Sequence, residues 1–150
     1  MSTNNQEMQI LLVEDNAADG ELTLDALRNC GLVNTVQWVK DGAEALDVLF
    51  RSGANSAAES HRLRLVLLDL RLPRVDGLDV LRALRADQRT RLLPVVVMTS
   101  SREESDLVRA YDLGANSYVV KPVESEAFMH AVRELGLYWM LINKLPGDTK

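Results

Sequence analysis

The sequence predicts an α/β fold in which a parallel sheet is covered by helices on both faces, giving a three-layer sandwich. Short apolar runs alternate with longer amphipathic segments along the chain. Two of these runs, 63–68 and 94–98, are almost continuously apolar, as parallel strands covered on both faces must be. The links between runs and segments are short, which favours right-handed crossovers between successive strands.

Length, charge and composition limit the class of protein. A chain of 150 residues predicts one domain, which we assign to 8–142 between a flexible N-terminus (1–7) and a tail (143–150). The net charge of −5 argues against a general nucleic-acid surface, and no apolar run approaches the roughly 18 residues that span a bilayer. We therefore expect a protein that binds neither nucleic acid nor membrane. A single cysteine, Cys30, cannot form an intrachain disulfide, which favours a cytoplasmic location.

Five apolar runs are predicted strands, and each is followed by a segment of helical periodicity. The predicted strands span about 9–13, 35–39, 63–68, 94–98 and 117–120. The apolar helix faces comprise Leu22, Ala26 and Leu27, then Ala45, Leu46, Leu49 and Phe50, then Val80, Leu81 and Leu84, then Leu107, Ala110, Tyr111 and Leu113, and finally Phe128, Ala131, Val132 and Leu135.

Start and stop signals agree with these helices. The segments 41–44 and 101–104 pair an N-cap acceptor with an acid three residues later, which is the spacing of a capping box. Gly31 and Gly114 follow helical segments, where a left-handed residue ends a helix at low cost. The loop at 52–62 is the longest irregular stretch, and no function can be assigned to it.

Polar residues follow four of the predicted strands where each strand ends. Glu14 and Asp15 follow the first, Asp69 the third, and Lys121 the fifth, while Thr99 ends the fourth. Because open parallel sheets build their sites at the carboxyl ends of strands, we expect these residues to share one mouth. Three carboxylates would repel each other there unless a cation intervened, and Mg²⁺ prefers such oxygen ligands.

These residue types favour an acyl-phosphate site. A carboxylate would take a phosphoryl group, while the metal, the lysine and the threonine hydroxyl would hold its oxygens. Asp69 is the favoured nucleophile because it stands alone at the end of a central strand, whereas adjacent Glu14 and Asp15 suit a metal better. His61 and His130 are isolated, and the lack of a His/Cys cluster argues against zinc.

The motifs resemble those of response regulator receiver domains of two-component signalling over about residues 8–135. The matching segments are Val-Glu-Asp-Asn at 13–16 for the acidic pair, Leu-Asp-Leu-Arg-Leu-Pro at 68–73 with Asp76-Gly77 for the phospho-acceptor loop, Thr99-Ser100 for the switch hydroxyl, Lys121-Pro122 for the lysine and its proline, and Tyr118 for the switch aromatic.

The resemblance implies a flavodoxin-like (βα)₅ fold with strand order 2-1-3-4-5. It implies that Asp69 accepts phosphate from a histidine kinase. Asp15 would bind Mg²⁺ directly, Glu14 largely through water, and the backbone carbonyl of Arg71 would be a further ligand. The peptide bond before Pro122 would be cis, which would aim the preceding lysine inward.

The resemblance also implies a two-state switch. Phosphate on Asp69 would draw Thr99 inward and let Tyr118 rotate into the vacated space, with Ser100 beside them in the same loop. The surface formed by the fourth helix, fifth strand and fifth helix would change as a result. Such a protein would be no enzyme in the ordinary sense, because it catalyses only its own Mg²⁺-dependent phosphorylation and dephosphorylation.

The last predicted helix ends in a run, 135–142, that is apolar around most of its circumference. One buried face cannot account for such a run, and exposed aromatics often mark partner surfaces. We therefore expect a homodimer in which each fifth helix reaches onto the other subunit, although the helix could instead fold back on its own domain. The expected interface residues are Phe128, Leu135, Tyr138, Trp139, Leu141 and Ile142.

This ending, with the segment 112–118, resembles one subgroup of receivers. These are small stand-alone receivers paired with phytochrome-type histidine kinases, although similar receivers lie beside other hybrid kinases. Because the chain stops at Lys150, we expect a stand-alone receiver whose output is protein contact or phosphotransfer.

Three other functions use related folds or chemistry. A phosphatase of the haloacid dehalogenase type needs a second acid two residues after its nucleophile, where this chain has Arg71. A flavin-binding electron carrier needs a phosphate-binding loop after the first strand, where Glu14 and Asp15 would repel a phosphate. A receiver-fold scaffold that dimerises and docks without being phosphorylated stays open, because fold alone cannot exclude it.

Overall fold

A five-stranded parallel sheet forms the centre of the protein, in the order β2-β1-β3-β4-β5. The computed structural model describes residues 8–32, 35–50, 62–146 and 148. The strands are β1 (Ile10–Val13), β2 (Val36–Val39), β3 (Leu65–Leu68), β4 (Val95–Thr99) and β5 (Ser117–Val120). The predicted fold class and strand order are confirmed.

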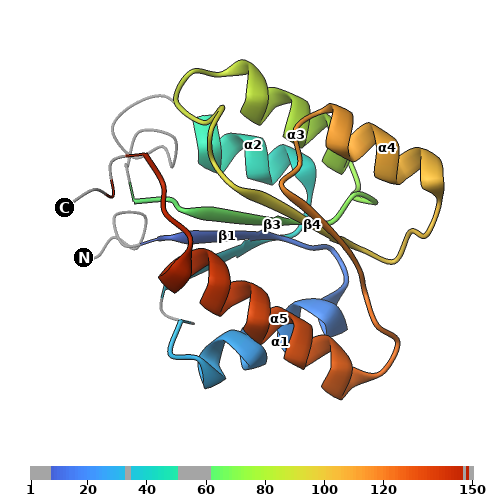
Figure 1. Ribbon diagram of the computed structural model, residues 1–150. Coiled ribbons are helices and arrows are strands. Elements are labelled where there is room, and N and C mark those ends of the chain that lie inside the picture. The colour runs from blue at the N-terminus through green and yellow to red at the C-terminus, as the bar shows by residue number, and fades with distance from the viewer. Residues whose placement is uncertain (1–7, 33–34, 51–61, 147, 149–150) are drawn as a thin grey trace.

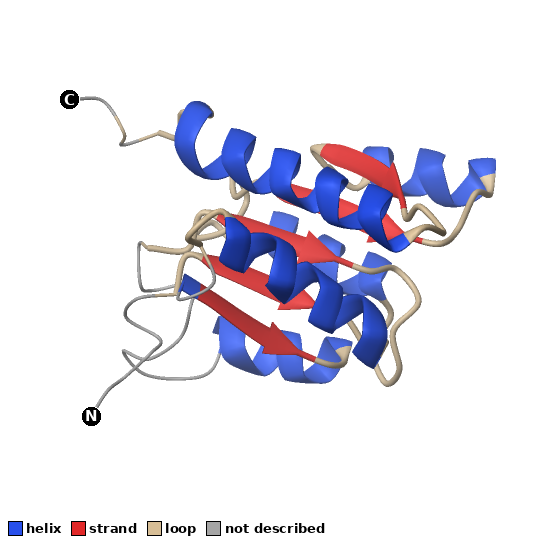
Figure 2. Cartoon of the chain, turned by 90° about the horizontal axis from the view of Figure 1, so that it is seen from below, coloured by secondary structure: helices blue, strands red, loops and turns tan. Residues whose placement is uncertain are grey.

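Helices cover both faces of the sheet and complete the three layers (Figure 1). One face is covered by α1 (Ala17–Asn29) and α5 (Ser125–Leu137), which Figure 2 shows in front of the strands. The other face is covered by α2 (Gly42–Phe50), α3 (Gly77–Ala86) and α4 (Glu104–Asp112). Among the residues that the structure describes, no helix is both long and apolar enough to cross a membrane.

The side chains of β1, β3 and β4 alternate between two apolar cores. Leu11, Val66 and Val97 point to the core beneath α2, α3 and α4. Leu12 and Leu67 point to the core beneath α1 and α5. These three central strands are buried along their whole length, whereas β2 and β5 at the edges are mostly half-buried. The central strands therefore carry the site residues out of a rigid interior.

Most predicted helix ends are confirmed, and one is wrong. Gly31 and Gly114 have φ values of 76° and 100°, in the left-handed region that ends a helix. Asp41 accepts the backbone N–H of Glu44 at 2.7 Å, as a capping acceptor should. Ser101 does not cap α4, which begins later, after an N-cap residue Glu103 that makes no side-chain cap bond.

The C-terminal helix differs from the prediction in its last turns. Regular α5 ends at Leu137 and passes into a π-helical turn, η4 (Tyr138–Ile142). Beyond it the chain returns to the sheet, where Arg64 at the start of β3 makes two hydrogen bonds to Asp148, of 3.0 and 2.8 Å. The proposed N-terminal flexibility and most of the 52–62 loop lie outside the described residues.

Phe128 is not available as an interface residue. Its side chain is 2% exposed and packs in the core beneath α1 and α5, so its inclusion in the expected dimer surface is wrong. Leu135 and Trp139 are half-buried and pack against the same core. Tyr138, Leu141 and Ile142 are exposed. The apolar ending therefore divides into residues that fold back and residues that face outward.

Candidate functional site

The loop after β1 places one buried and one exposed acid at the carboxyl edge of the sheet. Glu14 is 3% exposed and Asp15 is exposed. Glu14 Oε2 accepts the backbone N–H of Asn16 at 3.0 Å, and Asn16 caps α1 by accepting the N–H of Asp19 at 2.9 Å. The indole N–H of Trp38 donates to the Glu14 carbonyl at 2.8 Å. Together these bonds fix the acidic loop against the neighbouring strand and helix.

Asp69 follows β3 and lies almost wholly below the surface, with 7% of the residue exposed. Its Oδ1 accepts the backbone N–H of Arg71 at 3.2 Å. The loop that follows packs closely against α3, since a Cβ at Gly77 would collide with the carbonyl oxygen of Asp69. The carboxylate is therefore set by the backbone of its own loop.

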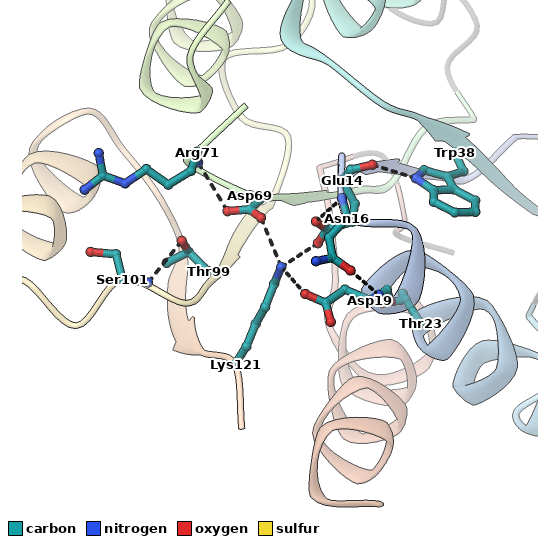
Figure 3. A network of polar contacts seen from close by, with 10 residues as sticks. All are labelled: Glu14, Asn16, Asp19, Thr23, Trp38, Asp69, Arg71, Thr99, Ser101 and Lys121. Carbon is teal, nitrogen blue, oxygen red and sulfur yellow. Dashed lines mark hydrogen bonds and ion pairs between the residues drawn. The ribbon is translucent and has the colours of Figure 1, made fainter. Parts of the chain in front are cut away.

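Lys121 joins the loops through its ammonium group (Figure 3). Its Nζ donates to Glu14 Oε1 at 2.7 Å, to Asp19 Oδ2 at 2.8 Å and to Asp69 Oδ2 at 3.0 Å. No peptide bond among the described residues is cis, so the predicted cis bond before Pro122 is wrong. The trans form is the lower in energy for most such bonds, and the lysine reaches the acids with it.

Burial and excess negative charge shift the ionisation of this cluster. Burial raises the pKa of Glu14 to about 7, with a contribution from the nearby Asp69 charge that the Lys121 hydrogen bond partly offsets. Burial alone would lower the pKa of Lys121, but hydrogen bonds to Asp19 and Glu14 raise it above its usual range. The lysine is therefore charged, and Glu14 releases its proton only near neutral pH.

Three carboxylates meet the requirements of a divalent cation site. Glu14, Asp15 and Asp69 each offer an oxygen, and these atoms lie within 4.8 Å of one another. All donors are hard oxygens from three different side chains, which suits Mg²⁺ or Mn²⁺ and not zinc. A dication would favour the charged form of Glu14, whose pKa is raised first by burial and further by the nearby Asp69 charge.

The predicted switch residues lie beside Asp69. Thr99 is fully buried at the end of β4, and its Oγ1 accepts the N–H of Ser101 at 3.3 Å. In Figure 3 Asp69 lies between Thr99 and Lys121. Ser100 is exposed. Tyr118 on β5 is half-buried, and its hydroxyl donates to the Ser101 carbonyl at 3.2 Å.

Sequence reasoning missed three residues that complete the site. Asp19 is the third partner of Lys121, and Trp38 holds the acidic loop. Asp106, in the first turn of α4, is 6% exposed and accepts from both Arg71 and Ser101. Asp19 lies one helical turn after Asp15, which could have placed it near the mouth. No sequence signal marks Asp106 or Trp38.

Comparison with known proteins agrees with this geometry. The family model for the response regulator receiver domain matches residues 10–133 of this chain. Probable methanogenesis regulatory protein FilR2 of Methanothrix harundinacea (strain 6Ac) is 43% identical over 93% of this chain and 88% of its own.

Two solved structures share most of the chain. The phosphorylated cyanobacterial phytochrome response regulator RcpA is 36% identical, with a TM-score of 0.84 over 93% of this chain and 99% of its own. The Mn²⁺-bound form of response regulator Rcp1 is 32% identical, with a TM-score of 0.82 over the same two shares. With the fold, the acidic cluster and the family model in agreement, the chain belongs to the response regulator receiver domain family.

Proposed function

We propose that this protein accepts a phosphoryl group on Asp69 from a histidine kinase and signals by a change of surface. The observation that carries this proposal is the buried Asp69 carboxylate, 3.0 Å from the Lys121 ammonium and grouped with Glu14 and Asp15. Membership of the receiver family supports a role in a phosphorelay.

The chemistry follows from the groups present. A carboxylate oxygen of Asp69 forms a bond to phosphorus while the bond from phosphorus to the donor's imidazole nitrogen breaks, and that nitrogen takes up a proton. Lys121, already charged, stabilises negative charge on the phosphoryl oxygens, and the hydroxyl of Thr99 can donate to another. The reaction is the protein's own modification, so we propose no turnover of a separate substrate.

Glu14, Asp15, Asp69 and the backbone carbonyl of Arg71 would hold a divalent cation, which we propose is Mg²⁺. When bound, it supplies positive charge that neutralises the phosphoryl oxygens. The donor set supports this assignment, as does the Mn²⁺-bound form of the similar Rcp1.

The switch would use the contacts around Tyr118. In the present structure the Thr99 hydroxyl accepts a hydrogen bond from the backbone N–H of Ser101. If this hydroxyl moved toward the phosphoryl group, that hydrogen bond would break. The carbonyl of Ser101 is the acceptor for Tyr118, so that contact would change as well. The α4-β5-α5 surface would change shape as a result, with Ser100 in the moving loop.

The kinase partner that we propose is a phytochrome-type histidine kinase in the cytoplasm. The likeness to the cyanobacterial phytochrome response regulator RcpA supports this choice. A different sensor kinase would be favoured if it transferred phosphate to Asp69 while phytochrome kinases did not.

We propose a homodimer formed by the end of the C-terminal helix. Tyr138, Leu141 and Ile142 are 46%, 69% and 65% exposed, an apolar patch that a second copy of this chain could cover. Trp139 lies between this patch and the core beneath α1 and α5, against which it packs. Its ring meets the Tyr138 ring edge-on, with 5.1 Å between the two centroids. The unit that dimerises would be residues 8–142.

The test is transfer of labelled phosphate from a phosphorylated kinase, or from acetyl phosphate with Mg²⁺, to the protein. We expect acid-labile, base-labile label on the wild type and none on Asp69→Asn. Asp76→Asn is the matched control, because Asp76 is an exposed acid in the same loop that caps α3. Equal labelling of Asp69→Asn would refute the assignment, and no labelling of the wild type by any donor would favour the unphosphorylated scaffold.

A further inference from the structure

Asp106 is a buried carboxylate that the phosphoryl chemistry does not itself use. It lies in the first turn of α4 and only 6% of the residue is exposed. One of its oxygens, Oδ2, accepts from the Arg71 guanidinium at 2.6 Å and from the Ser101 hydroxyl at 2.6 Å. It thereby joins α4 to the loops that follow β3 and β4.

This contact fixes the direction of the Arg71 side chain. The backbone N–H of Arg71 donates to Asp69, yet its guanidinium points away from that carboxylate (Figure 3). Its charged partners are Asp106 and, more distantly, Glu103, whose Oε1 lies 3.8 Å from Nη2. The Arg71 side chain is 64% exposed, so its position depends on these partners and not on packing.

The Ser101 hydroxyl is the second donor to Asp106, although its spacing predicts that this residue is the N-cap of α4. Its oxygen accepts the backbone N–H of Glu103 at 3.3 Å, and its proton is donated to Asp106. A short charge-assisted bond of this kind is stronger than a neutral cap bond. Ser101 therefore lies outside the helix, whose N-cap is Glu103, and gives the buried carboxylate a second donor.

A phosphoryl group on Asp69 would create a competitor for the guanidinium. Such a group carries about two negative charges and offers three acceptor oxygens, two residues from Arg71. The Asp106 carboxylate opposes this attraction because it is buried, already paired and held by a rigid helix.

We propose that Asp106 is a positioning residue that holds the Arg71 guanidinium away from the phosphoryl group on Asp69. The mouth of the site then stays open to water, and the phosphoryl lifetime is short. This inference rests on the proposed phosphorylation of Asp69. In hydrolysis a water oxygen bonds to phosphorus, the bond from phosphorus to the Asp69 oxygen breaks, and the carboxylate is regenerated. The two water protons leave on dihydrogen phosphate.

The test measures loss of the aspartyl phosphate after the phosphodonor is removed. The variants are Asp106→Asn, Arg71→Ala and the double variant, with Asp79→Asn as control. Asp79 is also in the first turn of its helix and ion-paired, with Arg82 at 2.7 Å, but it is exposed. A neutral amide competes poorly with the phosphoryl group, so Asp106→Asn should slow the loss about three- to tenfold. The control should match the wild type.

If Asp106 acts through Arg71, its substitution should have little effect once Arg71 is removed, whereas a purely structural role of Asp106 would not depend on Arg71. In the Arg71→Ala background, Asp106→Asn should change the rate by less than about twofold. Arg71→Ala alone should not lengthen the lifetime, which tests the inference even if Asp106→Asn fails to fold.

Three outcomes would overturn the inference: unchanged or faster loss in Asp106→Asn, equal slowing without Arg71, or slower loss in Arg71→Ala alone. If the wild type takes no phosphate, the proposed function fails first, and this outcome is distinct from the other three.

Discussion

At the scale of single residues, the site is set by an imbalance of charge. The Lys121 ammonium contacts three carboxylates, and Asp15 adds a fourth close by. One positive charge cannot neutralise four carboxylates, so the site should attract a cation even when Asp69 carries no phosphoryl group. The same lysine donates to Asp69 at 3.0 Å, where a phosphoryl group would bind.

Asp19 should contribute to metal binding although it is not among the clustered ligands. Asp19→Asn removes one negative charge from the mouth while keeping the shape of the side chain. We expect divalent metal affinity to fall about three- to tenfold, measured by calorimetric titration with Mg²⁺ or Mn²⁺. Asp25→Asn, on the same helix but exposed and paired with Arg28, should leave the affinity unchanged. Equal losses in both variants would mean that net charge alone matters.

The raised pKa of Glu14 predicts how stability depends on pH. With a folded-state pKa of about 7 against 4.5 when unfolded, the folded protein binds more protons between these values. Stability from this group is therefore present below pH 4.5 and lost as pH rises through 7, by roughly 3 kcal/mol in all. Glu14→Gln should flatten this part of the curve in metal-free urea unfolding between pH 5 and pH 8.

Saturating Mg²⁺ provides the internal control for this pH dependence. A cation among the carboxylates favours the charged form of Glu14, so it should reduce the loss of stability above pH 6. A wild-type curve as steep with metal as without it would show that Glu14 is not part of the metal site.

At the scale of elements, the acceptor loop is held by the close approach of α3. A Cβ at Gly77 would meet backbone atoms of Asp69 and Leu70, which cannot move as a side chain can. Gly77→Ala should therefore cost about 1–3 kcal/mol of stability in chemical denaturation and also slow phosphorylation, because Asp69 must shift. Gly31→Ala meets no atom within 4 Å and strains only the backbone, so it should leave phosphorylation unchanged.

The central strands and their polar ends could be predicted because burial leaves a simple pattern. β1, β3 and β4 are apolar on both faces, so the first polar residue after each lies at the edge of the sheet. Asp106 could not be recognised, because acids are common in the first turn of any helix, and Asp19 had only its spacing from Asp15 to mark it. Ser101 has the spacing of a cap, and only the packing of α4 reveals that Asp106 uses its hydroxyl.

At the scale of the whole molecule, the phosphoryl site and the exposed C-terminal patch lie in different parts of the fold. The site lies at the carboxyl edge of the sheet, where the loops after β1, β3 and β5 meet the first turn of α1, whereas the exposed patch follows the C-terminal end of α5. We therefore expect the proposed phosphorylation and dimerisation to be separable by mutation.

Mass measured by size-exclusion chromatography with light scattering tests that separation. Each protomer exposes Leu141 and Ile142 in a turn that ends the helix, and burying such side chains stabilises an interface by about 1.5–3 kcal/mol each. Leu141→Ser with Ile142→Ser should therefore yield monomers while labelling of Asp69 persists. Val123→Ser, exposed just before α5 begins and so at the opposite end of that helix, should not. A mass change that requires both acetyl phosphate and Asp69 would couple the two surfaces. A dimer under all conditions would make the patch a constitutive interface and leave signalling to the α4-β5-α5 surface. A wild-type monomer under all conditions would contradict the proposed dimer but would not affect the proposed phosphoryl chemistry.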